Sequence, residues 1–227
     1  MWYKVKRIYQ WTNLVRPVWK PNANTIAYYP LTSSTTTSDL SWNNRNLTNS
    51  WVTFGTYKWV DCAYSNKTSY LTKSSFATNL QNLTISAWVY YVWNNSSWDW
   101  NYNQFVWRWW GSTENFWAYT ENFYTPWRLV CSPWWFWRFQ LTNNSQWYNV
   151  VVTYNYSTTT ATMYVNGVAG TSNTSTNPPS WTNIWIGGKE SNHWWNWWLS
   201  EFIVENKVWT LDEISNYYNQ TKSKYWL

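Results

Sequence analysis

The sequence predicts an all-β sandwich of the jelly-roll type that is closed by one short C-terminal helix. Three observations support this prediction: short runs of β-branched and aromatic residues recur along the chain, clusters of Asn, Ser, Thr and Pro separate them, and only 11% of residues are charged. Such a composition favours strands and loops over surface helices. A chain of 227 residues is long enough for one domain of this kind with its own core.

The predicted strands follow an N-terminal arm. Residues 1–22 are basic, contain Pro17 and Pro21 and carry little strand pattern, so we predict an arm at 1–22 and a single domain at 23–227. The strands expected in that domain are Thr25–Leu31, Val52–Tyr57, Val60–Tyr64, Leu83–Tyr91, Gln104–Trp107, Phe116–Thr120, Arg128–Cys131, Phe136–Leu141, Trp147–Tyr154, Thr160–Val165, Ile184–Ile186 and Leu199–Val204.

Two local signals indicate a hairpin and the closing helix. The pair Asn166-Gly167 lies between two β runs, and Asn-Gly is preferred in a type I′ hairpin because both central residues take positive φ. The segment Thr210–Glu213 is a capping box, which opens a helix. The apolar face expected for that helix consists of Leu211, Ile214 and Tyr218.

Charge and hydropathy limit the partners. The net charge is +6 and the pI is about 9.2, but the basic residues are scattered and form no dense stripe, so we predict no nucleic-acid binding. No apolar run reaches the length of a membrane span, so we predict no membrane insertion. The basic start lacks the apolar segment of a signal peptide.

The two cysteines are expected to be separate, buried thiols. Cys62 and Cys131 each lie within a strand-like run, which is typical of buried free cysteine, and a single disulfide between them is the alternative. With one histidine, His193, in the whole chain, a Cys- or His-based metal site lacks ligands.

The order of the motifs resembles the laminin-G-like, concanavalin A-like lectin jelly roll. The resemblance covers about residues 25–221, and it implies a jelly-roll β-sandwich that binds carbohydrate. The motifs that carry it, in the order of the family, are Leu83–Val89, Trp147–Asn155, Met163–Val168, Ile184–Gly188, Leu199–Val204 and Leu211–Ile214.

The tryptophans depart from that family pattern. The chain has 27 Trp and only 6 Gly, whereas average usage of about 7% would give roughly 16 Gly. Trp88, Trp147 and Trp209 fall where the family has a large apolar residue, so we expect them in the core. Many others fall where the family has glycine, including the segment 194–198, which resembles a Gly-rich turn.

We hypothesise that these other tryptophans are encoded by UGA and are glycine in the genetic code of the source. Glycine would supply the positive φ that turns require. The alternative is that they are true tryptophans that form stacking platforms for sugars or bases. The positions concerned are most of Trp2, Trp11, Trp19, Trp42, Trp51, Trp98, Trp100, Trp107, Trp109, Trp110, Trp127, Trp135, Trp137, Trp181, Trp185, Trp194, Trp195, Trp197, Trp198 and Trp226.

A calcium ion is the expected cofactor. Asp39, Asn43 and Asn44 lie in one turn together with carbonyl groups, and Ca²⁺ prefers such oxygen ligands. The family resemblance implies a further carboxylate from the last strand, which here is Glu201. The alternative is that Asp39 organises its own turn and that Glu201 pairs with a base. A weaker second candidate is Asp99-Trp100-Asn101.

The carboxylates do not predict an enzyme. Glu201 and Glu205 project on the same side of a strand, but four residues of strand separate them by about 13 Å, far more than the roughly 5–5.5 Å of a retaining glycosidase. His193 has no nucleophile in a recognisable context. We therefore predict a chain without catalytic residues.

The predicted function is a non-catalytic glycan-binding or structural module. With glycine restored at position 11, the arm resembles leading segments of phage virion and tail-associated proteins, which implies adhesion or decoration on a virion or an extracellular surface. The partners would then be a glycan or cell-surface polysaccharide, other virion proteins and further copies of the chain. The alternative is a bacterial cell-surface carbohydrate-binding domain, and a glycoside hydrolase comes third.

Overall fold

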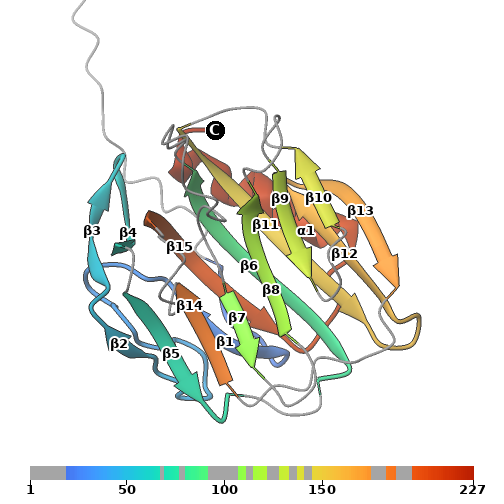
Figure 1. Cartoon of the computed structure of the whole chain (residues 1–227), viewed down its shortest axis with the longest axis horizontal. Coiled ribbons are helices and arrows are strands. Elements are labelled where there is room, and N and C mark those ends of the chain that lie inside the picture. The colour runs from blue at the N-terminus through green and yellow to red at the C-terminus, as the bar shows by residue number, and fades with distance from the viewer. Residues whose placement is uncertain are drawn as a thin grey trace, which may run out of the picture.

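The structure is a computed structural model that describes residues 19–66, 69–76, 80–91, 107–110, 115–121, 128–132, 137–140, 145–174, 183–187 and 196–227. Within these ranges the chain forms two antiparallel sheets, which Figure 1 shows one in front of the other. The predicted all-β sandwich with one C-terminal helix is confirmed.

Counted over the described residues, the first sheet has eight strands and the second has seven. The first has the order β13 (Val168–Thr174), β12 (Thr160–Val165), β11 (Gln146–Asn155), β6 (Asn82–Tyr91), β15 (Asn196–Glu205), β4 (Val60–Asn66) and β3 (Thr53–Tyr57), with β1 (Thr25–Tyr29) also paired to β15. The second has the order β10 (Trp137–Gln140), β9 (Arg128–Ser132), β8 (Asn115–Glu121), β7 (Trp107–Trp110), β14 (Asn183–Gly187), β5 (Tyr70–Ser74) and β2 (Thr48–Ser50).

Each face of the first sheet buries an apolar cluster. The inner cluster joins side chains of both sheets, for example Ile85 and Val152 with Leu71 and Ile186. The outer cluster lies between the first sheet and the C-terminal helix and includes Trp88. Because both faces of β6 and β11 are covered, burial is nearly continuous along them and includes polar residues such as Thr84 and Asn149.

The helix α1 (Leu211–Thr221) begins at the predicted capping box. The Thr210 side chain accepts a hydrogen bond from the Glu213 backbone N–H, and the Glu213 side chain accepts one from the Thr210 N–H. The predicted apolar face was wrong in part, since the buried residues of α1 are Ile214, Tyr217 and Thr221, whereas Leu211 is 55% exposed. The short 3-10 helix η1 (Lys222–Tyr225) continues α1 across the outer cluster.

The predicted Asn-Gly hairpin is confirmed. Asn166 and Gly167 have φ values of 52° and 78° between β12 and β13, as a type I′ turn requires. The turn is also held against β11, because the Asn149 N–H donates to Asn166 Oδ1 at 2.9 Å. A Cβ atom at Gly167 would lie 3.3 Å from the Tyr218 ring, so the helix packs directly on this turn.

The strand β15 changes partner halfway along. Leu199 pairs with Ala63 of β4, and Val204 pairs with Ala27 of β1. The change occurs at an irregularity between Ser200 and Ile203, where Glu201 has a φ of 53°. No pattern in the sequence indicated this bulge.

The predicted Gly-rich turn at 194–198 was wrong in its second half. Asn196, Trp197 and Trp198 already belong to β15 and pair with β4, whereas Trp194 and Trp195 lie outside the described residues. Hydrogen bonding to a neighbouring strand therefore overrides the family's turn pattern here. Trp185, by contrast, lies in β14, as the predicted strand Ile184–Ile186 implies.

Most of the other predicted strands are present with boundaries that differ by a few residues at most. The Gln104–Trp107 prediction meets the described residues only at Trp107, where β7 begins. The strands that were not predicted are β2, β5 and β13. β2 and β5 are largely polar, and their strand form comes from pairing rather than from an apolar pattern: β5 pairs with β14 on one side and with β2 on the other.

The tryptophans of the described residues include two contrasting structural groups. Trp88, Trp147 and Trp209 are buried, which confirms the prediction that they belong to the core. The second group, which we call the turn tryptophans, is exposed and has the left-handed φ that favours glycine. Its members are Trp51 (φ 68°, 87% exposed), Trp59 (φ 66°, 81%) and Trp226 (φ 62°, 73%).

The remaining predictions concern the cysteines, the membrane and the arm. Cys62 is a free thiol buried in the outer cluster, and burial raises its pKa to about 12. No helix among the described residues has the length and apolar character needed to cross a membrane. The arm falls outside the described residues up to residue 18, and Trp19 contacts Tyr28 with ring centroids 4.9 Å apart.

Candidate functional site

A polar hollow of about 400 Å³ lies at one end of the first sheet. It is formed where β6 begins, where β11 and β15 end and where β1 begins, because these strand ends lie side by side in the antiparallel register. We call it the amide hollow, since five of its residues are Asn or Gln. Its lining is Asn24, Gln81, Asn82, Asn155, Tyr156, Ser157, Asn206, Lys207 and Val208.

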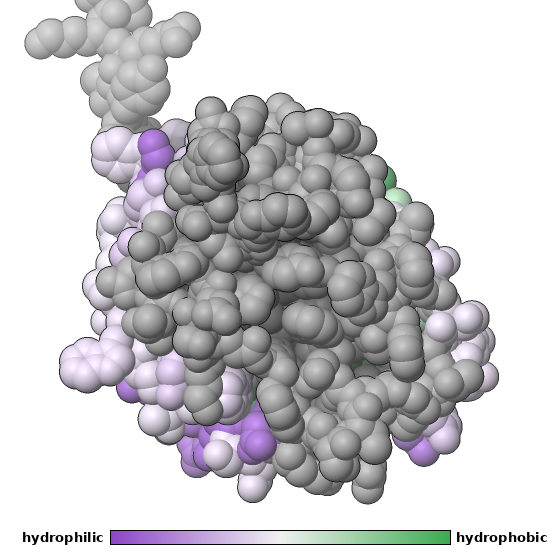
Figure 2. All heavy atoms as spheres, in the orientation of Figure 1, coloured by the Kyte–Doolittle hydropathy of each residue, from purple (hydrophilic) through white to green (hydrophobic). Residues whose placement is uncertain are grey.

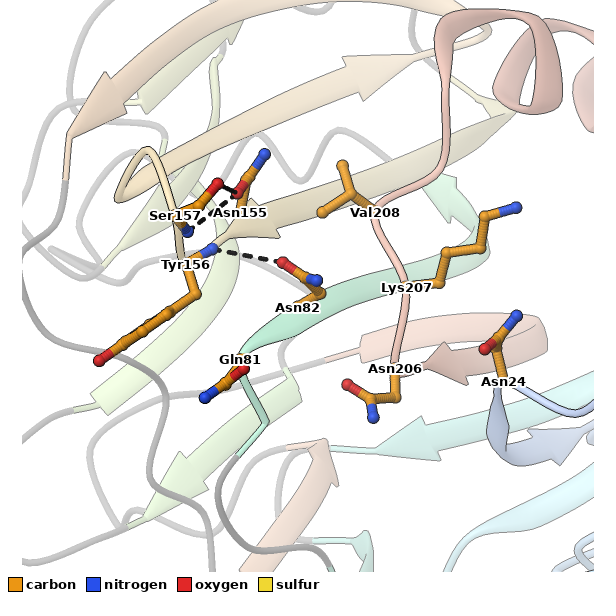
Figure 3. Close-up of a pocket in the computed structure, with 9 residues that line it drawn as sticks. All are labelled: Asn24, Gln81, Asn82, Asn155, Tyr156, Ser157, Asn206, Lys207 and Val208. Carbon is orange, nitrogen blue, oxygen red and sulfur yellow. Dashed lines mark hydrogen bonds between the residues drawn. The ribbon is translucent and has the colours of Figure 1, made fainter.

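The described residues of the amide hollow come from four segments, which are Asn24, residues 81–82, residues 155–157 and residues 206–208. Figure 3 shows Gln81 and Asn82 between the Tyr156–Ser157 turn on one side and the 206–208 segment on the other. Tyr156 is 44% exposed, so its ring is presented at the lip. Carboxamides both donate and accept hydrogen bonds, and an exposed ring offers a flat apolar surface. This combination suits a small ligand with many hydroxyl groups and one apolar face.

The first side of the amide hollow is held by turn hydrogen bonds. The Tyr156 N–H donates to Asn82 Oδ1 at 3.4 Å, which ties the β11–β12 turn to β6. Asn155 Oδ1 accepts from the Ser157 N–H at 3.0 Å and from its hydroxyl at 2.8 Å. Tyr156 is therefore fixed between two residues whose hydrogen bonds organise the turn.

The second side is held by Thr84 of β6. Its hydroxyl donates to the Lys207 carbonyl at 2.5 Å and accepts from the Trp209 N–H at 2.9 Å. The Asn206 N–H donates to the Asn24 carbonyl at 2.8 Å. The backbone of the 206–208 segment is thus hydrogen-bonded both to β6 and to Asn24, which fixes the positions from which its side chains project.

The lining of the amide hollow carries little free charge. Among the described lining residues, only Lys207 has a formal charge, and its ammonium group pairs with the Glu213 carboxylate. That pair lowers the pKa of Glu213, chiefly through the hydrogen bond from Lys207. In Figure 2 the described residues at the rim of the molecule are mostly hydrophilic, with small hydrophobic areas. The hollow therefore suits a neutral polar ligand.

The predicted calcium ligands of the first loop are engaged in holding that loop together. Asp39 is buried, and its Oδ1 accepts from the N–H groups of Tyr28 and Ser41, while its Oδ2 accepts from the Ser41 hydroxyl and the Arg45 N–H. A carboxylate has about four lone-pair positions, and all are used. The Asn43 amide donates to the Thr25 carbonyl at 2.8 Å. Asn44 is exposed at a left-handed turn position with a φ of 52°.

Glu201, the predicted fourth ligand, instead binds side chains of the C-terminal helices. Its carboxylate accepts from the Tyr217 hydroxyl at 3.0 Å and pairs with Lys224 at 2.5 Å. Burial, reinforced by the Glu201 charge, raises the pKa of Tyr217 far above its usual range. In the part of the chain that the structure describes, no three His, Cys, Asp or Glu residues gather into a metal-binding group.

In this arrangement Asp39, Asn43, Asn44 and Glu201 do not form an open oxygen cage, and calcium binding stays a prediction. The measurement that checks it is the melting temperature with and without millimolar CaCl2, compared between the wild type and Asp39→Asn. A rise in the wild type that the variant loses would assign the ion to this loop. The second candidate, Asp99-Trp100-Asn101, lies outside the described residues, as does His193.

The two glutamates of β15 are not placed for hydrolysis. Glu201 and Glu205 both contact residues of the outer cluster, Tyr217 and Trp209, which agrees with the predicted projection to one side. They are only 6% and 1% exposed, so neither carboxylate faces a substrate in this arrangement.

Sequence reasoning missed the amide hollow entirely. Its lining comes from four separate segments of the chain, and no spacing rule joins them. The signal that could have indicated it is the concentration of Asn and Gln at strand ends, as in Gln81-Asn82 and Asn155-Tyr156. In a chain so rich in Asn, that signal alone does not separate a binding site from ordinary turns.

Comparison with known proteins supports the fold. No family model and no curated protein sequence matches the chain. The solved structures that resemble it include the binding domain of botulinum neurotoxin serotype G, with a TM-score of 0.62 and 16% identity over 88% of this chain and 52% of that one. Another is domain 4 of AbnA, a GH43 extracellular arabinanase from Geobacillus stearothermophilus, in complex with arabinotriose, with a TM-score of 0.63 and 15% identity over 85% of this chain and 97% of that domain.

A third structure is the binding domain of Paraclostridial Mosquitocidal Protein 1, with a TM-score of 0.60 and 16% identity over 86% of this chain and 52% of that one. The chain therefore spans about half the length of the toxin binding domains and nearly all of the arabinanase domain. At these identities the likeness establishes the fold, an antiparallel β-sandwich, and the ligand has to be argued from the chain's own residues.

Proposed function

We propose that the chain is a non-catalytic carbohydrate-binding module whose amide hollow binds neutral sugars. The observation that carries this proposal is the concave, amide-rich lining with the exposed Tyr156 ring at its lip. Sugars present hydroxyl groups that match carboxamides and C–H faces that stack on aromatic rings. The shared fold adds support, because a domain of the same architecture was solved with arabinotriose.

None of the described residues that line the amide hollow is a tryptophan, so this proposal does not rest on how the turn tryptophans are encoded. The binding site that we propose is therefore distinct from the alternative site, a platform of exposed tryptophan rings. A ligand on the platform would contact exposed rings such as Trp42, which is 76% exposed and lies outside the lining.

We expect Tyr156→Ala and Asn206→Ala each to weaken sugar binding about tenfold, which corresponds to about 1.4 kcal/mol. Tyr156→Ala removes the stacking ring, and Asn206→Ala removes one amide while the Asn206 backbone bond to Asn24 stays. The measurement is isothermal titration calorimetry with arabinotriose, cellotriose and chitotriose, where a shallow site predicts dissociation constants on the order of 0.1–1 mM.

Trp42→Ala is the matched control, since it removes an exposed ring outside the hollow. Unchanged affinity in Trp42→Ala alongside the two losses assigns the sugar to the hollow. If Trp42→Ala loses binding and Tyr156→Ala keeps it, the ligand belongs to the tryptophan surface and the proposal is wrong.

The finer proposal is an adhesion or decoration role on a virion or tail, with a cell-surface polysaccharide as the target and with virion proteins or further copies of the chain as partners. Its support is the resemblance of the arm to leading segments of such proteins. A gene neighbourhood of virion structural proteins is the expected result. A secretion signal on a longer reading frame would favour the alternative, a bacterial cell-surface carbohydrate-binding domain. Polysaccharide hydrolysis that Glu201→Gln abolishes would favour the third candidate, a glycoside hydrolase.

We also propose that the turn tryptophans are glycine in the protein as its source makes it. The support is conformational. The β3–β4 hairpin places Lys58 and Trp59 at φ values of 46° and 66°, the same pattern that Asn166 and Gly167 adopt in the β12–β13 hairpin. Trp226 occupies the left-handed C-cap of η1, where glycine is the usual residue. Trp59 was not among the positions that the sequence singled out.

A further inference from the structure

We propose that Glu205 is the positioning residue of the amide hollow, an inference that rests on the proposed function. Glu205 is the last residue of β15 and precedes the lining segment 206–208 directly. Its side chain is 1% exposed and does not line the hollow. It instead forms hydrogen bonds to the two segments that carry Asn24 and Asn206.

Three donors converge on the Glu205 carboxylate. On the Asn24 side, the Asn22 amide donates to Oε1 at 2.5 Å and the Thr25 hydroxyl donates to the same oxygen at 3.2 Å. On the other side, the Trp209 indole N–H donates to Oε2. One carboxylate therefore joins the residues that flank Asn24 to the residue that follows the lining segment.

The bonds of Asn22 transmit this anchoring to Asn24. The Asn24 N–H donates to Asn22 Oδ1 at 2.8 Å, and the Asn22 N–H donates to the Thr25 hydroxyl oxygen at 2.8 Å. The Asn22 side chain thus holds Asn24 with its oxygen and Glu205 with its nitrogen. Loss of the Glu205 carboxylate would free the Asn22 amide nitrogen, so the side chain that holds the Asn24 N–H would lose its own anchor. The backbone bond from Asn206 to Asn24 would then lack this support.

The chemistry of the site requires a carboxylate. An ionised carboxylate only accepts hydrogen bonds, which matches three donors, and hydrogen bonds to a charged acceptor are stronger than those between neutral groups. A glutamine side chain at this position has nearly the same shape but places an NH2 group against a donor on one side. The isosteric change Glu205→Gln therefore breaks one side of the anchor with little change in volume.

Glu201 provides a matched control. It lies on the same strand and is also buried, but its carboxylate accepts from Tyr217 and Lys224 of the C-terminal helices. Glu201→Gln therefore perturbs the fold by a comparable change at a place that does not hold the hollow.

The experiment measures sugar affinity for Glu205→Gln, Glu201→Gln and the double variant Asn22→Asp with Glu205→Gln. The probe is whichever of arabinotriose, cellotriose and chitotriose the wild type binds most tightly. We expect Glu205→Gln to weaken binding at least about tenfold, equal to about 1.4 kcal/mol, and Glu201→Gln to change it less than about threefold. In the double variant the introduced amide at position 205 can donate to the introduced carboxylate at position 22. We therefore expect its affinity to return to within about threefold of the wild type.

A second readout needs no ligand. The Trp209 indole N–H resonance, assigned with Trp209→Phe, should shift in Glu205→Gln and return in the double variant. Amide hydrogen exchange at Asn206 should accelerate in Glu205→Gln and not in Glu201→Gln. These measurements also show whether Glu205→Gln is folded.

The outcomes separate the two proposals. If Tyr156→Ala weakens binding but Glu205→Gln behaves like Glu201→Gln, the positioning role is wrong and the proposed function stands. If the wild type binds none of the three sugars, the proposed function loses its support and the ligand-free readout decides the positioning role. Unchanged Trp209 and Asn206 signals in Glu205→Gln would then overturn it.

Discussion

Replacing Trp88 by alanine is expected to lower the free energy of unfolding by about 3–5 kcal/mol, the usual cost of removing a large aromatic side chain from a core. Trp88 is fully buried on the outer face of β6. Its ring stacks on Tyr225 of η1 with centroids 3.8 Å apart and an interplanar angle of 11°, and on Tyr218 of α1 at 5.9 Å. The substitution would leave a cavity between the sheet and both C-terminal helices.

The measurement is denaturant-induced unfolding followed by circular dichroism. Trp42→Ala is the control, because an exposed side chain contributes within about 0.5 kcal/mol. A loss below about 1 kcal/mol for Trp88→Ala would mean that the C-terminal helices do not pack on the first sheet as described.

Several parts of the fold could be predicted because local chemistry determines them. The capping box at Thr210 and the positive φ of Asn166 and Gly167 depend on residues within a few positions of one another. The burial of Trp88 and Trp147 could be predicted because they fall where the family that the sequence resembles has a large apolar residue. These features need no knowledge of which strands become neighbours.

The rest depends on neighbours that are distant in sequence. The bulge in β15 arises where its partner changes from β4 to β1, and neither partner can be read from the β15 sequence. The hydrogen bond from the Tyr28 N–H to the Asp39 carboxylate likewise forms only once β1 lies beside the loop that carries Asp39. The amide hollow likewise exists only because the ends of β6, β11 and β15 meet at one edge.

Replacing all three turn tryptophans by glycine is expected to raise the free energy of unfolding by about 2 kcal/mol in total. A left-handed conformation costs a residue other than glycine roughly 1–2 kcal/mol, and the substitution removes this cost. The greater entropy of glycine in the unfolded chain offsets about 0.5–1 kcal/mol of the resulting stabilisation at each position. Trp51, Trp59 and Trp226 are 87%, 81% and 73% exposed, so little apolar burial is lost. Denaturant unfolding of the triple variant beside the parent chain measures the difference.

Trp42→Gly is the control for this effect, because Trp42 is also exposed, at 76%, but does not have a positive φ. The free energy of unfolding of Trp42→Gly should not rise, since glycine there adds entropy to the unfolded state without relieving a left-handed conformation. A gain in the triple variant and none in Trp42→Gly would mean that backbone conformation selects glycine at the three turns. Glycine masses at positions 51, 59 and 226 in the protein from its native source would then identify the codon reading as the cause. If the triple variant is instead less stable than the parent, the exposed rings make contacts of their own, and the tryptophan surface becomes the rival to the amide hollow as the place where sugar stacks.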